Sequence, residues 1–240
     1  MGVNILILAA GQSSPESRED SYPLCLTETD GMSLIERIVL NTKKIPDSKY
    51  CFALLDKDAE KFHLDKVVKL LVKDSTVIKI PEYTKGSACT ALLAASQLNQ
   101  QDELLIISAN ELVNIDFSNV LNDFNLRKLD GGTLIFKSVH PRYSYVSLNT
   151  DRIVIEAAQQ KPISQNATAG VFWFARTHDF AEAAKNLIRK NASVNGKFYV
   201  APTFNELILK QMKVGTIDLN VDDYKLLKTE RQAQQFESGL

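Results

Sequence analysis

The chain has few of the residues that mark disulfide-rich, membrane or collagen-like proteins. Its 240 residues include only three cysteines, ten glycines and seven prolines, and no apolar run approaches the roughly 20 residues that a membrane-spanning helix needs. Lysine and arginine number 28 and aspartate and glutamate 29, so the net charge is −1. These absences exclude a disulfide framework, a membrane span and a globally basic nucleic-acid binder.

What remains is the composition of a folded globular protein. Hydrophobic residues make up 45% of the chain and charged residues 24%, both close to the average for soluble domains. We expect one compact domain over residues 1–229, followed by a frayed tail at 230–240. The N-terminus runs into apolar residues without the basic lead of a secretion signal, so we expect a cytoplasmic protein; whether it forms a homo-oligomer stays open.

Short apolar runs alternate with amphipathic segments in the first half of the chain. This alternation predicts an α/β fold, because buried parallel strands are continuous apolar runs joined by helices. The expected strands cover residues 3–10, 50–55, 76–80 and 104–108. The expected helices cover 33–41, capped by Ser33, then 58–71 with Phe62, Val67, Leu70 and Leu71 facing inward, and a third that begins at Gly86.

The second half of the chain carries strands that follow one another closely, which predicts antiparallel additions to the sheet. These strands are expected at 132–137, 145–148, 153–157 and 169–175, and a last one at 214–219. Helices are expected at 120–128, 179–190 and 204–213, and Asp222 and Asp223 are expected to cap a final helix.

Several familiar catalytic motifs are absent. The first loop has Gly11 as its only glycine, so the three-glycine dinucleotide motif is missing, and Lys85-Gly86-Ser87 has the wrong order for a Walker phosphate loop. The three histidines show no ligand spacing for zinc, and no Gly-x-Ser-x-Gly elbow occurs. In a largely parallel sheet the ligand crevice lies at the carboxyl ends of the strands, which here means the loops at 11–25 and 108–114.

A series of short segments, in a fixed order, nevertheless carries a family resemblance. The series begins with Ile-Leu-Ile-Leu-Ala-Ala-Gly at 5–11 and continues through 22–26, 31–36, 86–91, 105–111, 156–164, 167–174 and 195–202. The chain resembles the sugar-1-phosphate nucleotidyltransferases, including relatives that activate small phosphorylated alcohols in surface-polysaccharide pathways. This resemblance implies a Rossmann-like, three-layer α/β/α (GT-A-like) nucleotidyltransferase fold with a mixed, mainly parallel sheet.

The same resemblance implies roles for particular residues. It implies binding of a nucleoside triphosphate at Ala9, Ala10, Gly11, Gly86 and Ser87. It implies binding of a phosphorylated sugar or small alcohol at Gln159, Gln160 and Gly170. The catalytic positions fall on Arg18 and Asn110, and Mg²⁺, if the protein is active, falls on Asn110, Glu111 and Asp218.

The chain departs from the family at the charged positions. Leu24 stands where the loop lysine is expected, Asn110 where a metal-binding aspartate is expected, and Gln159-Gln160 where a Glu-Lys pair is expected. Two hypotheses follow. Either the protein is a nucleotidyltransferase in which Glu111, Asp116 or Asp218 supplies a displaced carboxylate, or it is an inactive pseudoenzyme that binds a nucleotide, a sugar phosphate or a partner subunit. Asn110 and Glu111 could also be plain turn residues.

Overall fold

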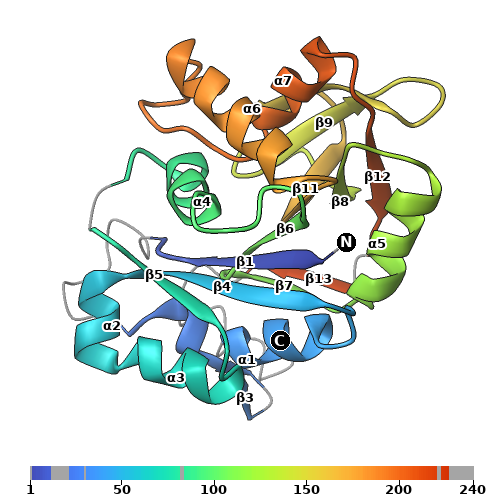
Figure 1. The fold of residues 1–240 in the computed structure, drawn as a ribbon. Helices are drawn as coiled ribbons and strands as arrows, with labels where there is room; N and C mark the ends of the chain where they lie inside the picture. Colours follow the sequence, from blue (N-terminus) through green and yellow to red (C-terminus); the bar gives the residue numbers. More distant parts are fainter. Residues whose placement is uncertain (1, 12–21, 30, 82–83, 221–222, 227–240) are drawn as a thin grey trace.

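The computed structural model describes residues 2–11, 22–29, 31–81, 84–220 and 223–226. Arg18 and the tail at 230–240 lie outside these residues. A nine-stranded mixed sheet runs through the described part of the chain, with helices above and below it in Figure 1.

Four parallel strands form one side of the sheet. They are β1 (Val3–Ala9), β4 (Ser48–Leu55), β5 (Thr76–Ile80) and β6 (Glu103–Ser108). β1 lies between β4 and β6, with Ile7 paired to Phe52 on one side and to Ile107 on the other. These elements confirm the four strands predicted in the first half of the chain; β1, β4 and β6 are largely buried, whereas β5 lies at the edge of the sheet with only Ile80 buried.

Five further strands complete the sheet. They are β8 (Gly131–Lys137), β9 (Ser144–Leu148), β10 (Val154–Gln159), β11 (Asn166–Phe174) and β12 (Val214–Asp218). β11 is antiparallel to β6, β8 and β9, β10 is antiparallel to β9, and β12 is parallel to β8. Of these nine strands, therefore, only β10 and β11 run against the common direction, which confirms a mixed, mainly parallel sheet.

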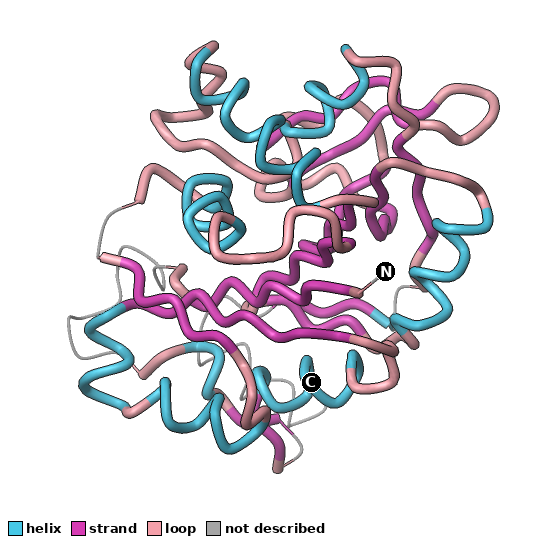
Figure 2. Tube along the Cα trace, viewed as in Figure 1, coloured by secondary structure: helices cyan, strands magenta, loops and turns pink. Residues whose placement is uncertain are grey.

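Helices cover both faces of the sheet (Figure 2). One face carries α1 (Leu34–Thr42), α2 (Asp56–Phe62), α3 (Leu64–Leu71) and α5 (Phe117–Leu126). The other carries α4 (Ser87–Ala95), α6 (Thr177–Arg189) and α7 (Thr203–Leu209). Alternate residues of β1 enter the two cores, Ile5 and Ile7 the first and Leu6 the second. The three-layer α/β/α architecture is therefore as predicted.

The helix predicted over 58–71 is wrong as a single element. His63 adopts a left-handed conformation with φ 53° and divides the segment into α2 and α3. Because the second helix restarts after this residue, its apolar face turns: Leu64 and Val68 are buried, whereas Leu70, predicted to face inward, is 88% exposed.

Two short strand pairs outside the main sheet were not predicted. One joins β2 (Glu28–Thr29) to β3 (Met32–Ser33), next to the short 3₁₀ helix η1 (Leu24–Leu26). The other joins β7 (Glu111–Val113) to β13 (Tyr224–Leu226). Asp223 therefore precedes a strand and not the expected helix, and Asp222 lies outside the described residues. Among the described helices, none is long and apolar enough to cross a membrane.

Candidate functional site

The candidate site lies where β11 changes its neighbour. Val171 pairs with Ile107 of β6, but four residues earlier Ala167 pairs with Tyr145 of β9. Gly170 lies between these pairs with φ 65°, inside an irregularity of the ladder to β8. Because β6 and β9 separate at this point, a crevice is expected there, as it is wherever neighbouring strands of an open sheet diverge.

The loops that follow β1 and β6 meet at this point of divergence. The Ala109 N–H donates to the Leu8 carbonyl at 3.0 Å, so the end of β6 is held beside the end of β1. Ala9, Ala10 and Asn110 follow, all half-buried, and Gly11 is exposed. The structure thus brings Asn110 close to Ala9 and Ala10, two of the residues predicted to bind the triphosphate.

Glu111 projects from the same loop onto Gly170. A Cβ atom at Gly170 would overlap the Glu111 carboxylate, so both the positive φ and this close approach require glycine. The Tyr224 hydroxyl donates to Glu111 Oε2 at 2.8 Å. Tyr224 is buried and stacks on Phe136 with ring centroids 4.2 Å apart. Burial, and then the neighbouring Glu111 charge, raise the pKa of Tyr224, so its phenol stays protonated and remains a donor.

The described residues do not provide a good set of ligands for Mg²⁺, which prefers anionic oxygens. Asn110 is neutral, and the Glu111 carboxylate already accepts from Tyr224. Asp218 forms an ion pair with Arg152, and Asp116 caps α5 by accepting from the Ser118 N–H at 2.9 Å. No group of three or more His, Cys, Asp or Glu side chains in the described part of the chain is arranged to hold a metal ion.

Leu24 lies in an apolar contact close to the same loop. It packs against the buried side chains of Leu34, from α1, and Leu112, the residue after Glu111. An aliphatic cluster therefore occupies the place where the resemblance implies a lysine that would face phosphate oxygens.

The residues predicted for the nucleotide at α4 have a structural task as well. Gly86 precedes α4 with φ 108°, and a Cβ atom there would overlap the Phe198 carbonyl oxygen and lie 2.8 Å from the Phe198 nitrogen. The Phe198 carbonyl accepts from the Ala88 N–H at 3.0 Å, and the Phe198 N–H donates to the Lys85 carbonyl at 2.6 Å. Gly86 is thus required for this chain crossing, and half-buried Ser87 opens the helix beside it.

The predicted acceptor residues lie at the end of β10. Gln159 pairs with Ser144 of β9, whose hydroxyl is 2.6 Å from that of Thr168 on β11, close to Gly170. Gln160 has φ 57°, its N–H donates to the Tyr143 carbonyl at 2.9 Å, and its side-chain oxygen accepts from Asn195 at 3.2 Å. Hydrogen bonds therefore hold both glutamines near the crevice.

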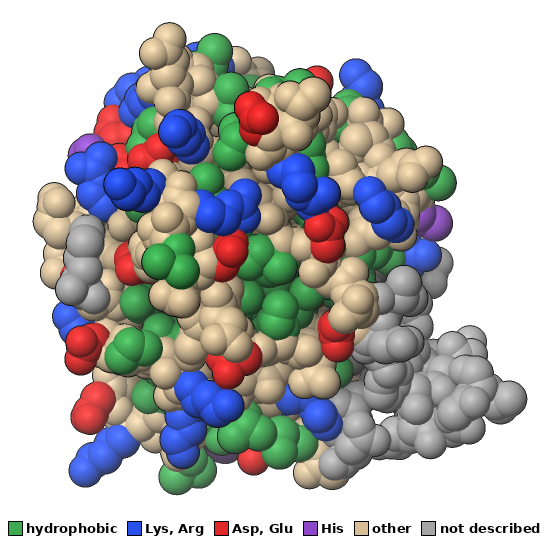
Figure 3. All heavy atoms as spheres, turned by 90° about the vertical axis from the view of Figure 1, so that its right-hand side faces the viewer, with side chains coloured by type: hydrophobic (Ala, Val, Ile, Leu, Met, Phe, Trp, Pro, Cys, Tyr) green, Lys and Arg blue, Asp and Glu red, His purple; other side chains and the backbone are tan. Residues whose placement is uncertain are grey.

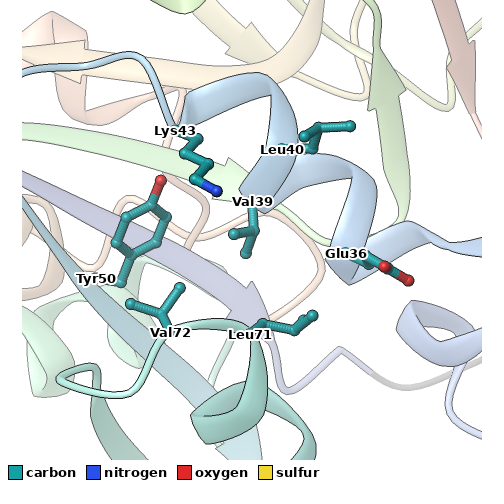
Figure 4. A pocket seen from close by; sticks show the side chains of 7 residues that line it. All are labelled: Glu36, Val39, Leu40, Lys43, Tyr50, Leu71 and Val72. Carbon is teal, nitrogen blue, oxygen red and sulfur yellow. The ribbon is translucent and has the colours of Figure 1, made fainter.

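Two hollows among the described residues lie away from the candidate site. One, of about 310 Å³, lies between α1, α3 and β4 and is lined by Val39, Tyr50, Leu71 and Val72 among others (Figure 4). Another, of about 480 Å³, lies between α4 and α6. Neither includes a predicted site residue. On the face drawn in Figure 3, several basic side chains lie in a row across the upper half, with acidic and apolar side chains between and below them.

Sequence reasoning missed three features of this site: Tyr224, the Leu24 cluster, and Asn205, whose amide bonds to β10. Only the apolar character of the 22–26 segment offered a signal for any of them. Leu24 is aliphatic where a lysine is implied, and this substitution agrees with packing and not with phosphate contact.

Comparisons with known proteins identify the class of fold. No family model and no curated protein matches the chain. A nucleoside-diphosphate-sugar pyrophosphorylase from Vibrio cholerae RC9 is 20% identical with a TM-score of 0.78, covering 98% of this chain and 99% of that one. A putative glucose-1-phosphate thymidylyltransferase from Bacillus anthracis is 17% identical with a TM-score of 0.73, covering 99% and 94%.

A third solved structure, the inositol-1-phosphate CTP transferase from T. maritima, is 12% identical with a TM-score of 0.71, covering 99% of this chain and 97% of that one. At these identities the likeness concerns the fold alone. The chain has the Rossmann-like α/β fold of the nucleotidyltransferases.

Proposed function

We propose that the chain binds a nucleoside triphosphate together with a phosphorylated sugar or small alcohol in the crevice at Gly170, as the synthesis of activated sugars for surface polysaccharides requires. The fold and the order of the resembling segments support this proposal. So does the geometry, because Ala9, Ala10 and Asn110 meet where β6 and β9 diverge.

The reaction of this class is an in-line phosphoryl substitution. A phosphate oxygen of the acceptor would attack the α-phosphorus of the triphosphate. A new phosphorus–oxygen bond forms, the bond to the β-phosphate breaks, and pyrophosphate leaves with that electron pair. Charge spreads over the phosphate oxygens in the transition state, so the rate depends on cations and hydrogen-bond donors placed around them.

We further propose that this transfer step is slow and that the chain acts mainly as a binding or scaffolding module. The observation that carries this proposal is the apolar contact of Leu24 with Leu34 and Leu112 beside neutral Asn110. The implied cation and the implied anion have both been replaced, and removing one transition-state donor typically costs about 2.7 to 4 kcal/mol. The described carboxylates do not form a ligand set that fits Mg²⁺.

Calorimetric titration with the four common nucleoside triphosphates, with and without Mg²⁺, tests the proposal, together with a pyrophosphate-release assay on a panel of sugar 1-phosphates and alcohol phosphates. We expect one nucleotide to bind equally with and without Mg²⁺, and pyrophosphate release far below the usual 1 s⁻¹ or more of enzymes. Absence of any nucleotide binding would contradict the first proposal. Tight binding only with Mg²⁺, or rapid turnover, would contradict the second.

A carboxylate added at the proposed crevice tests where the nucleotide binds, and the same charge added elsewhere is the matched control. Gly11→Asp adds a carboxylate at the exposed end of β1 and should weaken triphosphate binding at least tenfold through repulsion. Gln97→Glu adds the same charge at an exposed position after the carboxyl end of α4 and should leave binding unchanged. Equal effects of the two variants would place the nucleotide outside this crevice.

A further inference from the structure

Among the described strands, none pairs with the outer edge of β10 over most of its length. β10, β9, β11, β8 and β12 are paired in succession, and a single bridge between Ile153 and Gly215 returns from β12 to the start of β10. Beyond Ile153, α7 and not a strand runs along β10; α6 and α7 are at the top of Figure 1. The backbone groups on this edge therefore need partners from elsewhere.

Asn205 of α7 supplies both partners for one residue of this edge. The Ala157 N–H donates to Asn205 Oδ1 at 2.8 Å, and Asn205 Nδ2 donates to the Ala157 carbonyl at 2.8 Å. A carboxamide carries one acceptor and donor hydrogens in one plane, as a peptide group does. The side chain thus replaces the peptide of a missing strand, and an aspartate of the same shape would lack the donor.

The helix that carries Asn205 is firmly held. The residues on either side of Asn205, Phe204 and Glu206, are buried. Both carboxylate oxygens of Glu206 accept from the Nζ of Lys190, the C-cap residue of α6, each at 2.8 Å. The Thr203 hydroxyl donates to the Val200 carbonyl at 2.6 Å. Asn205 is therefore held in place by its helix, so it can hold the edge of β10 in a defined position.

We propose that Asn205 is a positioning residue that places the end of β10, and with it Gln159 and Gln160. Ala157 precedes Gln159 by two residues, and Gln159 pairs with Ser144 on the opposite edge. Holding Ala157 from the outside keeps the strand on β9 and keeps the Gln160 N–H on the Tyr143 carbonyl. The assignment of these glutamines to the acceptor rests on the proposed function, whereas the positioning itself does not.

Amide hydrogen exchange measured by NMR on the full chain tests the positioning. Asn205→Asp removes the donor and keeps the shape, and Asn205→Ala removes both partners. In Asn205→Ala we expect exchange of the Ala157 and Gln160 amides to become at least tenfold faster. Asn205→Asp keeps the acceptor of the Ala157 N–H and loses the donor to the Ala157 carbonyl, so there we expect faster exchange at the Gln160 amide. Amides of β1 and β6 should keep their wild-type rates in both variants. Asn125→Ala, which removes an exposed asparagine bonded to Glu103, should leave the Ala157 and Gln160 amides unchanged.

The Gln160 amide decides the outcome, because Asn205 does not touch it. If only Ala157 exchanges faster, Asn205 satisfies a local edge and the proposal fails. If neither amide changes, it also fails. Should Asn205→Ala not fold, Asn205→Asp carries the test alone, since it conserves the side-chain volume.

Acceptor binding gives a second readout that separates this proposal from the proposed function. For an acceptor phosphate that binds the wild type, we expect Asn205→Asp to weaken acceptor affinity about tenfold and to leave triphosphate affinity unchanged. An unchanged acceptor affinity together with faster Gln160 exchange would remove the glutamines from the acceptor site. If the wild type binds no acceptor, the proposed function fails while the exchange experiment still decides whether Asn205 positions β10.

Discussion

The two sides of the proposed crevice differ at the positions where the family resemblance implies charged residues. On the nucleotide side, Leu24 packs against Leu34 and Leu112, so the position implied to hold a cation has become part of the apolar interior. On the acceptor side, Gln159 and Gln160 replace an implied ion pair but stay in a network of hydrogen bonds with β9 and Asn195. The nucleotide side is apolar at this position, and the acceptor side is polar but uncharged.

This difference bears on what each side can still do. An aliphatic side chain cannot donate a hydrogen bond to a phosphate, and burying a phosphate against it without a partner costs free energy. A glutamine side-chain amide both donates and accepts hydrogen bonds, so it can still orient a sugar or alcohol. The comparison therefore predicts that binding of a neutral, hydroxyl-bearing group survives better than stabilisation of a reacting triphosphate.

The largest expected effect concerns Gly86, which packs against the Phe198 backbone at the start of α4. Gly86→Ala would force a Cβ atom into the Phe198 backbone at φ 108°, where the clash and the backbone strain add. We expect the free energy of unfolding to fall by about 3 kcal/mol or more, measured by urea denaturation. Gly11→Ala is the matched control, since no described atom lies within 4 Å of its Cβ position. It should cost less than about 0.5 kcal/mol; equal losses would show that Phe198 yields freely.

Most of the fold could be predicted because its strands are continuous apolar runs. The segments at 76–80 and 104–108 match β5 and β6 to within one residue. For β6 the reason is that a strand buried on both faces has few alternatives, whereas β5 lies at the edge of the sheet with only Ile80 buried. The division at His63 could not be predicted, because nothing local distinguishes a left-handed histidine from a helical one. The strand pair of β7 and β13 joins residues more than 100 positions apart, which no local pattern reveals.

The candidate site was predictable in its backbone and not in its side-chain contacts. Ala9, Ala10 and Asn110 meet as expected, because parallel strands end at the same edge of a sheet. The resemblance groups Asp218 with Asn110 and Glu111, but Asp218 lies on β12, which pairs with β8, and forms an ion pair with Arg152. The contact of Tyr224 with Glu111 depends on the path of the chain after β12, and sequence spacing carries no information about it.

A smaller effect on stability is expected at Tyr224, whose hydroxyl donates to the Glu111 carboxylate. Tyr224→Phe removes the hydrogen bond to the Glu111 carboxylate, and bonds to charged groups contribute about 1.5 to 3 kcal/mol. At pH 8 we expect the variant to be less stable by about 2 kcal/mol in urea denaturation. No loss of stability at pH 8 would mean that Glu111 does not depend on this donor.

The pH dependence of the same variant sharpens the test. The raised pKa of Tyr224 means that the folded chain keeps this proton while the unfolded chain loses it above about pH 10. The unfolded state then binds fewer protons, so wild-type stability falls as the pH rises beyond that point. The phenylalanine variant lacks this contribution, and the stability gap between the two proteins should narrow above about pH 10. A stability difference that stays constant above about pH 10 would contradict the raised pKa of Tyr224.

The smallest expected effect comes from restoring charge on the nucleotide side. In Leu24→Lys with Asn110→Asp, the lysine stem can lie along Leu34 and Leu112 while its ammonium reaches the crevice. We expect pyrophosphate release to rise about tenfold, equivalent to about 1.4 kcal/mol, because both charges return while Glu111 stays on Tyr224. The neutral pair Leu24→Gln with Asn110→Ser should give no gain. If the charged pair also gives no gain in pyrophosphate release, the acceptor side limits the reaction and not the nucleotide side. The variant Gln159→Glu with Gln160→Lys would then test the acceptor side directly.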